Sequence, residues 1–108
     1  MSTGEGATTV AVRVRLPAPL RELAGVPGEA VVEVRGPVTQ RSVLDALETA
    51  HPVLQGTVRD RASGRRRPFI RFYVGEEDRS HDEPDARLPA SVETGREAFA
   101  VIGAMAGG

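Results

Sequence analysis

Hydrophobic and polar residues alternate in three stretches of the chain, which is the pattern of β-strands that bury one face. In the first stretch, residues 10–16, apolar side chains occupy every second position, and alanine or arginine stands between them. The alternation recurs at residues 30–35 and 69–74, and residues 98–102 form a fourth, wholly apolar strand. The first two strands are joined by a short connection, which favours an antiparallel pair.

A helical period follows the second predicted strand. Thr39 is suited to the N-cap, and Val38 and Val43 have the spacing of a hydrophobic staple. Pro52 ends this helix at His51. Apolar residues recur at helical spacing between these ends: Val43, Leu44, Leu47 and Ala50.

Shorter features connect these elements. A helical turn is predicted at residues 17–25, where prolines precede two leucines three positions apart and Gly25 suits the C-cap. Residues 79–90 are polar, with Leu88 and, just beyond, Val92 as core anchors. Beyond the main helix, three residues are expected to anchor an irregular turn: Val53, Leu54 and Val58.

The order of elements is therefore strand, strand, helix, strand, polar segment, strand. Strands grouped around one main helix predict an α+β fold, in which the helix packs on one face of a single sheet. We expect residues 1–8 to form a disordered leader, residues 9–102 the folded domain and residues 103–108 a flexible tail.

Composition excludes several classes of chemistry. The chain has 108 residues, no cysteine and a net charge of −1, so it has no thiol chemistry and no global field that points to nucleic acid or an anionic membrane. All fourteen basic residues are arginine, which excludes a Walker lysine and a Schiff base. With no signal peptide and no long apolar run, we expect a cytoplasmic protein.

Few residues are candidates for catalysis or metal binding on this chain. His51 and His81 are interpreted as ordinary surface histidines. The carboxylates within residues 76–85 lack the glycine and the spacing of an EF-hand loop. A basic cluster has almost no interleaved aromatic residues, which favours a soluble loop or a docking contact for an acidic partner over nucleic-acid binding; it consists of Arg59, Arg61, Arg65, Arg66 and Arg67.

The C-terminal tail offers one reactive feature, which is a terminal carboxylate that follows two glycines. Gly107 and Gly108 lack a Cβ atom, so they can pass through a channel that would block a side chain. Six extended residues span roughly 20 Å. A carboxylate is a poor electrophile until ATP converts it to an acyl adenylate, and the chain has no recognised ATP-binding motif, so the activation would come from a partner.

The whole pattern resembles the MoaD/ThiS family of ubiquitin-like sulfur carrier proteins, over residues 10–108. Single motifs are weak, but in this order and with Gly-Gly at the end they are specific. The matching segments are residues 12–17 and 20–25, the helix at 39–52, residues 69–78, then Leu88, Val92 and Gly95, and the end Val101-Ile102 with Ala106-Gly107-Gly108.

The resemblance implies a β-grasp fold with a mixed sheet of four to five strands, in which the first and last strands lie side by side and parallel. It also implies that an E1-like adenylyltransferase, supplying ATP and Mg²⁺, adenylates Gly108. A sulfur donor enzyme then converts the end to a thiocarboxylate, which a sulfur-accepting synthase uses. No bound cofactor, metal or catalytic residue is expected on this chain. The implied tail residues are Ala106 and Gly107, and the implied partner-docking residues are Ile102 and Ala100.

In having a long loop at residues 59–68, the chain is similar to the actinobacterial carrier that feeds sulfur to cysteine biosynthesis. Two other functions remain open at this point. One is a protein modifier, whose activated Gly108 is attacked by lysines of target proteins. The other is a non-catalytic small subunit such as that of molybdopterin synthase.

Overall fold

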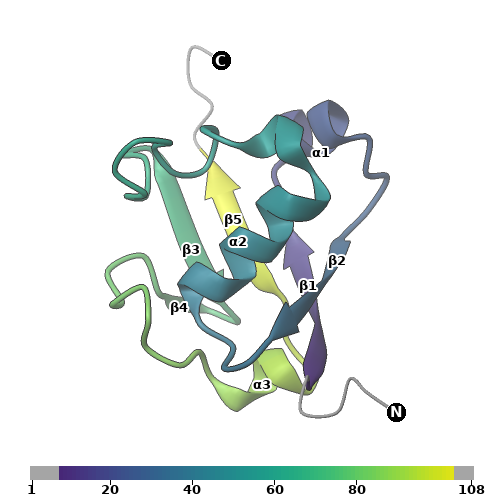
Figure 1. The fold of residues 1–108 in the computed structure, drawn as a ribbon, viewed down its shortest axis with the longest axis vertical. Helices are drawn as coiled ribbons and strands as arrows, with labels where there is room; N and C mark the ends of the chain where they lie inside the picture. The colour runs from purple at the N-terminus through teal and green to yellow at the C-terminus, as the bar shows by residue number, and fades with distance from the viewer. Residues whose placement is uncertain (1–7, 104–108) are drawn as a thin grey trace.

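The computed structural model describes residues 8–103, so residues 1–7 of the predicted leader and residues 104–108 of the predicted tail lie outside them. A five-stranded sheet is packed against one main helix (Figure 1). In chain order the elements are β1 (Thr9–Arg15), α1 (Ala18–Ala24), β2 (Ala30–Arg35), α2 (Gln40–Ala50), the 3-10 helix η1 (Pro52–Leu54), β3 (Ile70–Val74), β4 (Glu77–Asp78), α3 (Ala90–Glu93) and β5 (Phe99–Gly103).

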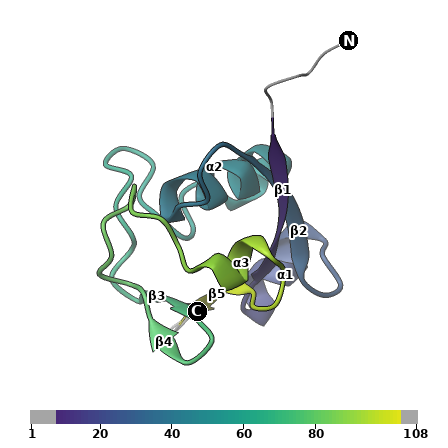
Figure 2. The same cartoon turned by 90° about the horizontal axis from the view of Figure 1, so that it is seen from below.

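The strands are ordered β2-β1-β5-β3-β4, with β5 at the centre. β1 and β2 are antiparallel, as predicted, and β5 runs parallel to β1 and antiparallel to β3. The α+β class and the β-grasp arrangement expected from the resemblance are therefore confirmed. Figure 2 shows the sheet from below, with α2 on its inner face.

The core lies between this inner face and α2, and the alternation of the sequence sorts the two faces correctly. On β2, for example, Val32 and Val34 are buried, whereas Val31 is exposed. The predicted apolar stripe of α2 is buried as well, apart from its last residue, Ala50. One anchor prediction was wrong, because Val53 is half-exposed and only Leu54 and Val58 of that turn enter the core.

The polar segment 79–90 is ordered by backbone pairing. The N–H of Leu88 donates to the carbonyl of Val38 at 2.9 Å, and Thr39 forms a β-bridge with Arg87. The hydroxyl of Ser80 is buried and accepts the N–H of Phe72 at 2.8 Å. These contacts hold the segment across one end of α2. In the sequence, the segment shows only two apolar anchors.

The N-terminus of α2 has a capping box. The Oγ1 of Thr39 accepts the N–H of Ser42 at 3.0 Å, and the Oγ of Ser42 accepts the N–H of Thr39 at 2.8 Å. Two donors that the helix cannot satisfy internally are thereby paired. The predicted N-cap is confirmed.

We expect Thr39→Ala to lower the free energy of unfolding by about 1 kcal/mol, because the N–H of Ser42 loses its acceptor. Urea denaturation measures this loss. Thr39→Ser is the matched control, since it keeps the capping oxygen and should stay close to wild type. Equal losses in the two variants would show that the methyl group, and not the cap, is responsible.

Candidate functional site at the end of the central strand

The end of β5 is where the C-terminal segment leaves the sheet (Figure 1). Gly103 pairs with Ile70, so β5 runs one residue beyond its predicted end. The predicted tail residues Ala106, Gly107 and Gly108 lie outside the described residues, and their roles stay predictions.

The two predicted docking residues differ in exposure, although both lie on the outer face of β5. Ala100 is only 7% exposed, because it is flanked on both sides by paired strands, in register with Arg15 of β1 and Tyr73 of β3. Ile102 is 47% exposed, because the pairing of β1 with β5 stops at Arg15, before Ile102 is reached. Ile102 thus offers a partner more surface than Ala100.

Long side chains lie on the strands and segments near Ile102. Arg71 stands opposite it on β3, and Phe69 precedes that strand with 70% of its surface exposed. Arg15 of β1 is paired with Ala100, two residues before Ile102. We call Arg15, Phe69, Arg71 and Ile102 the tail-root surface. It combines apolar and guanidinium groups, which are enriched in protein interfaces.

Carboxylates hold the arginines of this face in place. Arg71 pairs with Asp78 at 3.3 Å, and hydrogen bonds from Ser80 together with the charge of Arg71 lower the pKa of Asp78. Glu29 receives two hydrogen bonds from Arg13 and lies 3.5 Å from Arg15, and these contacts lower its pKa. Both carboxylates are therefore ionised at neutral pH and keep the guanidinium groups oriented.

A shallow hollow of about 160 Å³ lies on the outer face near the start of β5. Ala98 and Ala100 line it together with the side chains of Arg13, Arg15 and Glu97. Arg13 is already bound to Glu29 and to the carbonyl of Gly95 at 2.6 Å, so the hollow has little free binding capacity.

The loop from Arg59 to Arg67, here the arginine loop, lies between η1 and β3 and ends two residues before Phe69 of the tail-root surface. Arg59 is largely buried and forms ion pairs with Glu48, at 2.9 Å, and with Asp45 of α2. Arg66 donates to the carbonyls of Ile70, at 2.7 Å, and Ser80, at 3.2 Å. The sequence treated the five arginines as one cluster, but two of them hold the loop to the domain.

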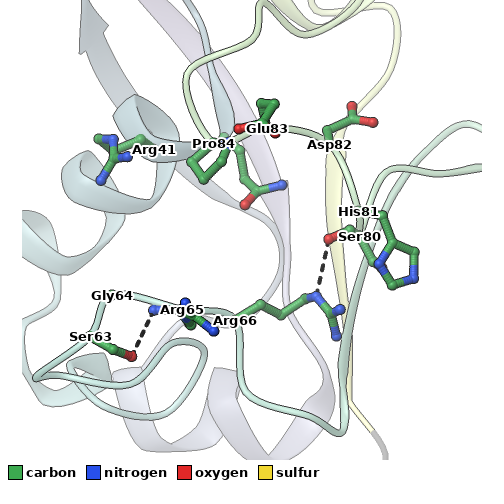
Figure 3. A pocket seen from close by; sticks show the side chains of 11 residues that line it. Arg41, Ser63, Gly64, Arg65, Arg66, Ser80, His81, Asp82, Glu83 and Pro84 are labelled. Carbon is green, nitrogen blue, oxygen red and sulfur yellow. Dashed lines mark hydrogen bonds between the residues drawn. The ribbon is translucent and has the colours of Figure 1, made fainter.

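A second hollow, of about 600 Å³, separates the arginine loop from the segment 79–90 (Figure 3). Arg65 and Arg66 line one wall, and Asp82 and Glu83 line the other. Arg41 at its edge is bound to both carboxylate oxygens of Asp85. Because its walls carry opposite charges and several guanidinium groups are already bonded, the hollow does not select an anion or a cation.

The histidines do not form a catalytic centre within residues 8–103. Ser80 directly precedes His81, a neighbour that the sequence interpretation overlooked, but its buried hydroxyl is engaged by the N–H of Phe72. His51 closes α2 as its C-cap. The described residues contain no group of three or more histidine or carboxylate residues placed to hold a metal ion. None of the helices described there has the length and apolarity that a membrane crossing requires.

Comparison by sequence finds neither a matching family model nor a matching curated protein. Solved structures do match. The crystal structure of SAMP1 from Haloferax volcanii has a TM-score of 0.68 at 26% identity, over 91% of this chain and 99% of that chain. A chain in the crystal structure of the Amycolatopsis orientalis BexX/CysO complex has a TM-score of 0.66 at 27% identity, over 91% of this chain and 100% of that chain.

This chain is similar to ubiquitin-like β-grasp carriers and modifiers of the MoaD/ThiS type. The match to CysO agrees with the actinobacterial branch suggested by the arginine loop. The solution structure of the Haloferax volcanii HVO 2177 protein, with a TM-score of 0.68 at 22% identity over 100% of this chain and 93% of that chain, shows the shared fold. The matched proteins are small carriers and modifiers rather than enzymes.

Proposed function

We infer that the chain is a sulfur carrier whose C-terminal carboxylate is activated and loaded by partner enzymes. The carboxylate of Gly108 attacks the α-phosphorus of ATP, pyrophosphate leaves, and an acyl adenylate forms. A sulfide then displaces AMP and leaves a thiocarboxylate; if a persulfide attacks instead, a thiol must cleave the resulting acyl disulfide. ATP and Mg²⁺ come with an E1-like adenylyltransferase, and a sulfur-accepting synthase, such as one of cysteine biosynthesis, takes the sulfur.

The observation that supports this function is the position of β5, the last strand before the C-terminal tail. β5 occupies the middle of the sheet, and the sequence after it consists of small and apolar residues that end in Gly-Gly. At the strand's exit, Ile102 is an exposed apolar contact framed by arginines. A rigid domain that positions a narrow terminal carboxylate suits delivery into a partner's active site.

The decisive experiment is the intact mass of the chain after incubation with ATP, Mg²⁺, an E1-like enzyme from the same genome and a sulfide source. We expect the mass increase that corresponds to replacing one oxygen by sulfur. Omitting ATP should prevent it. An unchanged mass with an enzyme that adenylates other carriers would contradict the function.

A second candidate function is conjugation to target proteins, which the similarity to SAMP1, a small archaeal modifier protein, favours. In that case lysine amines of other proteins attack the activated Gly108. The chain contains no lysine, so it cannot extend itself through lysine linkages. Adducts that survive denaturation and a reducing agent, and that need Gly108, would establish this function.

Ile102→Glu should reduce kcat/KM for adenylation roughly tenfold, because it places a charge where a partner is expected to bury an apolar side chain. Pyrophosphate release measures the rate, and urea unfolding should be close to wild type because Ile102 is half-exposed. Val31→Glu is the matched control, since Val31 is an exposed strand residue on β2. Docking at the end of β5 is disproved if the two variants are activated equally well.

A further inference from the structure

The arginine loop concentrates positive charge beside the tail root. Residues 59–67 hold five arginines and one aspartate, a formal charge of +4, although the whole chain has a net charge of −1. The remaining residues therefore sum to −5. The positive charge belongs to one segment and is not a property of the surface as a whole.

The loop is held in one conformation by its own contacts. The carboxylate of Asp60 accepts the N–H groups of Ala62 and Ser63, and bonds to Ser63 are the main reason that the pKa of Asp60 is lowered. The N–H of Gly64 donates to the carbonyl of Asp60 at 2.8 Å, and its φ of 75° is one that glycine adopts without strain. Side chains on such a loop lose less freedom when a partner binds.

Three arginines of the loop are exposed and form no ion pair with a carboxylate of the described residues. Arg61, Arg65 and Arg67 are exposed, and no carboxylate of residues 8–103 lies within ion-pair distance of them. The charge of Arg67 makes a small contribution to lowering the pKa of Asp60. Arg59, by contrast, is paired and largely buried.

An exposed aromatic side chain completes this surface and connects it to the tail root. Phe69 is the most exposed of the large apolar residues in the described part of the chain, and the next residue, Ile70, pairs with Gly103. A protein that takes up the tail must approach this region. Arginine and aromatic residues are the types that most often dominate the energy of protein interfaces.

We propose that Arg61, Arg65, Arg67 and Phe69 form a docking surface for an acidic patch, with an apolar recess for Phe69, on the enzyme that activates the tail. This rests on the proposed function and adds the chemistry of the partner's surface. The guanidinium groups speed encounter and select the partner, whereas the reaction takes place at the tail. Nucleic acid fits less well, because Phe69 is the one aromatic residue among residues 59–71 before β3 continues, so the three arginines have no interleaved rings on which bases could stack.

The test reverses these charges and follows adenylation by the E1-like enzyme through pyrophosphate release. The triple variant Arg61→Glu, Arg65→Glu and Arg67→Glu should lower kcat/KM at least about tenfold at low ionic strength, with kcat unchanged. The fall of kcat/KM with added salt, expected for wild type, should disappear. Phe69→Ala should lower kcat/KM while preserving the salt dependence, since it removes only an apolar contact.

The matched control reverses three arginines away from the arginine loop: Arg35, Arg87 and Arg96. It changes the net charge by the same amount and should stay within about twofold of wild type. Similar losses in both triple variants, or none in the loop variant, overturn the docking surface. The docking surface is also overturned if the loop variant is adenylated normally but no longer binds poly(U) RNA. If wild type itself is never adenylated, the proposed function fails, and the docking surface with it.

Discussion

A chain that lacks only Gly108 should no longer be adenylated, although it unfolds at the same urea concentration as wild type. The shortened chain still ends in a glycine carboxylate, but that carboxylate lies one residue, about 3.5 Å, short of its former reach. Reacting atoms must approach to about 3–3.5 Å, and a misplacement of about 1 Å can cost a hundredfold in rate. We therefore expect a loss of at least about a hundredfold in pyrophosphate release.

Two further variants separate reach from residue identity. Deleting Ala104 keeps the Gly-Gly end but shortens the approach to it, and should be as inactive as the chain without Gly108. Inserting one glycine after Gly103 in the chain that lacks Gly108 restores the length and should recover much of the rate. Wild-type activation of the chain without Gly108 would contradict a carrier that delivers its terminal carboxylate.

The sequence predicts the sheet well because the alternation of apolar and polar residues along a strand shows directly which side chains are buried. A strand such as β2 has one face in the core and one in solvent, and Ala30 and Val31 fall on opposite faces as expected. The main helix is equally well marked, because Thr39 and Pro52 bound it and an apolar stripe fills it. Where a segment contributes a regular face to the core, its pattern is sufficient to predict it.

Two short elements, β4 and α3, were missed. β4 comprises two charged residues, Glu77 and Asp78, which form a ladder with β3 because the turn at Gly75, with φ 61°, brings them alongside it. α3 has four residues, and its start at Ala90 follows a proline in a segment with few apolar residues. Segments of two or four residues are too short to show a repeating pattern of apolar side chains, so the sequence could not predict them.

In the candidate site, the sequence analysis named Ile102 and Ala100 together as docking residues and could not rank them by exposure. Both residues have the same strand parity, and their difference in exposure comes from the register, which ends the pairing of β1 with β5 at Arg15. The arginine loop shows the same limit. Arg59 and Arg61 look equivalent in the sequence, yet only Arg59 meets Glu48 on α2. A contact between distant segments leaves no local signal.

The largest effect on stability is expected at the aromatic pair that joins β3 to β5. Phe72 and Phe99 are fully buried, with ring centroids 5.1 Å apart, and Phe72 also pairs with Val101 through the backbone. Phe72→Ala should lower the free energy of unfolding by about 3–5 kcal/mol, because it removes a large apolar side chain and leaves a cavity. Domains of this size have about 5–15 kcal/mol in total, so much of the stability would be lost.

Urea unfolding of Phe72→Ala against Tyr73→Ala tests this expectation, since Tyr73 is the adjacent aromatic on the outer, half-exposed face. A loss in Tyr73→Ala as large as in Phe72→Ala would contradict a core centred on the pair. Substituting Phe72 and Phe99 by leucine, singly and together, should give a coupling of about 0.5–1.5 kcal/mol. The pair anchors the strand that carries the tail, so Phe72→Ala should reduce adenylation through loss of folded chain, whereas removal of Gly108 abolishes it in a chain that remains folded.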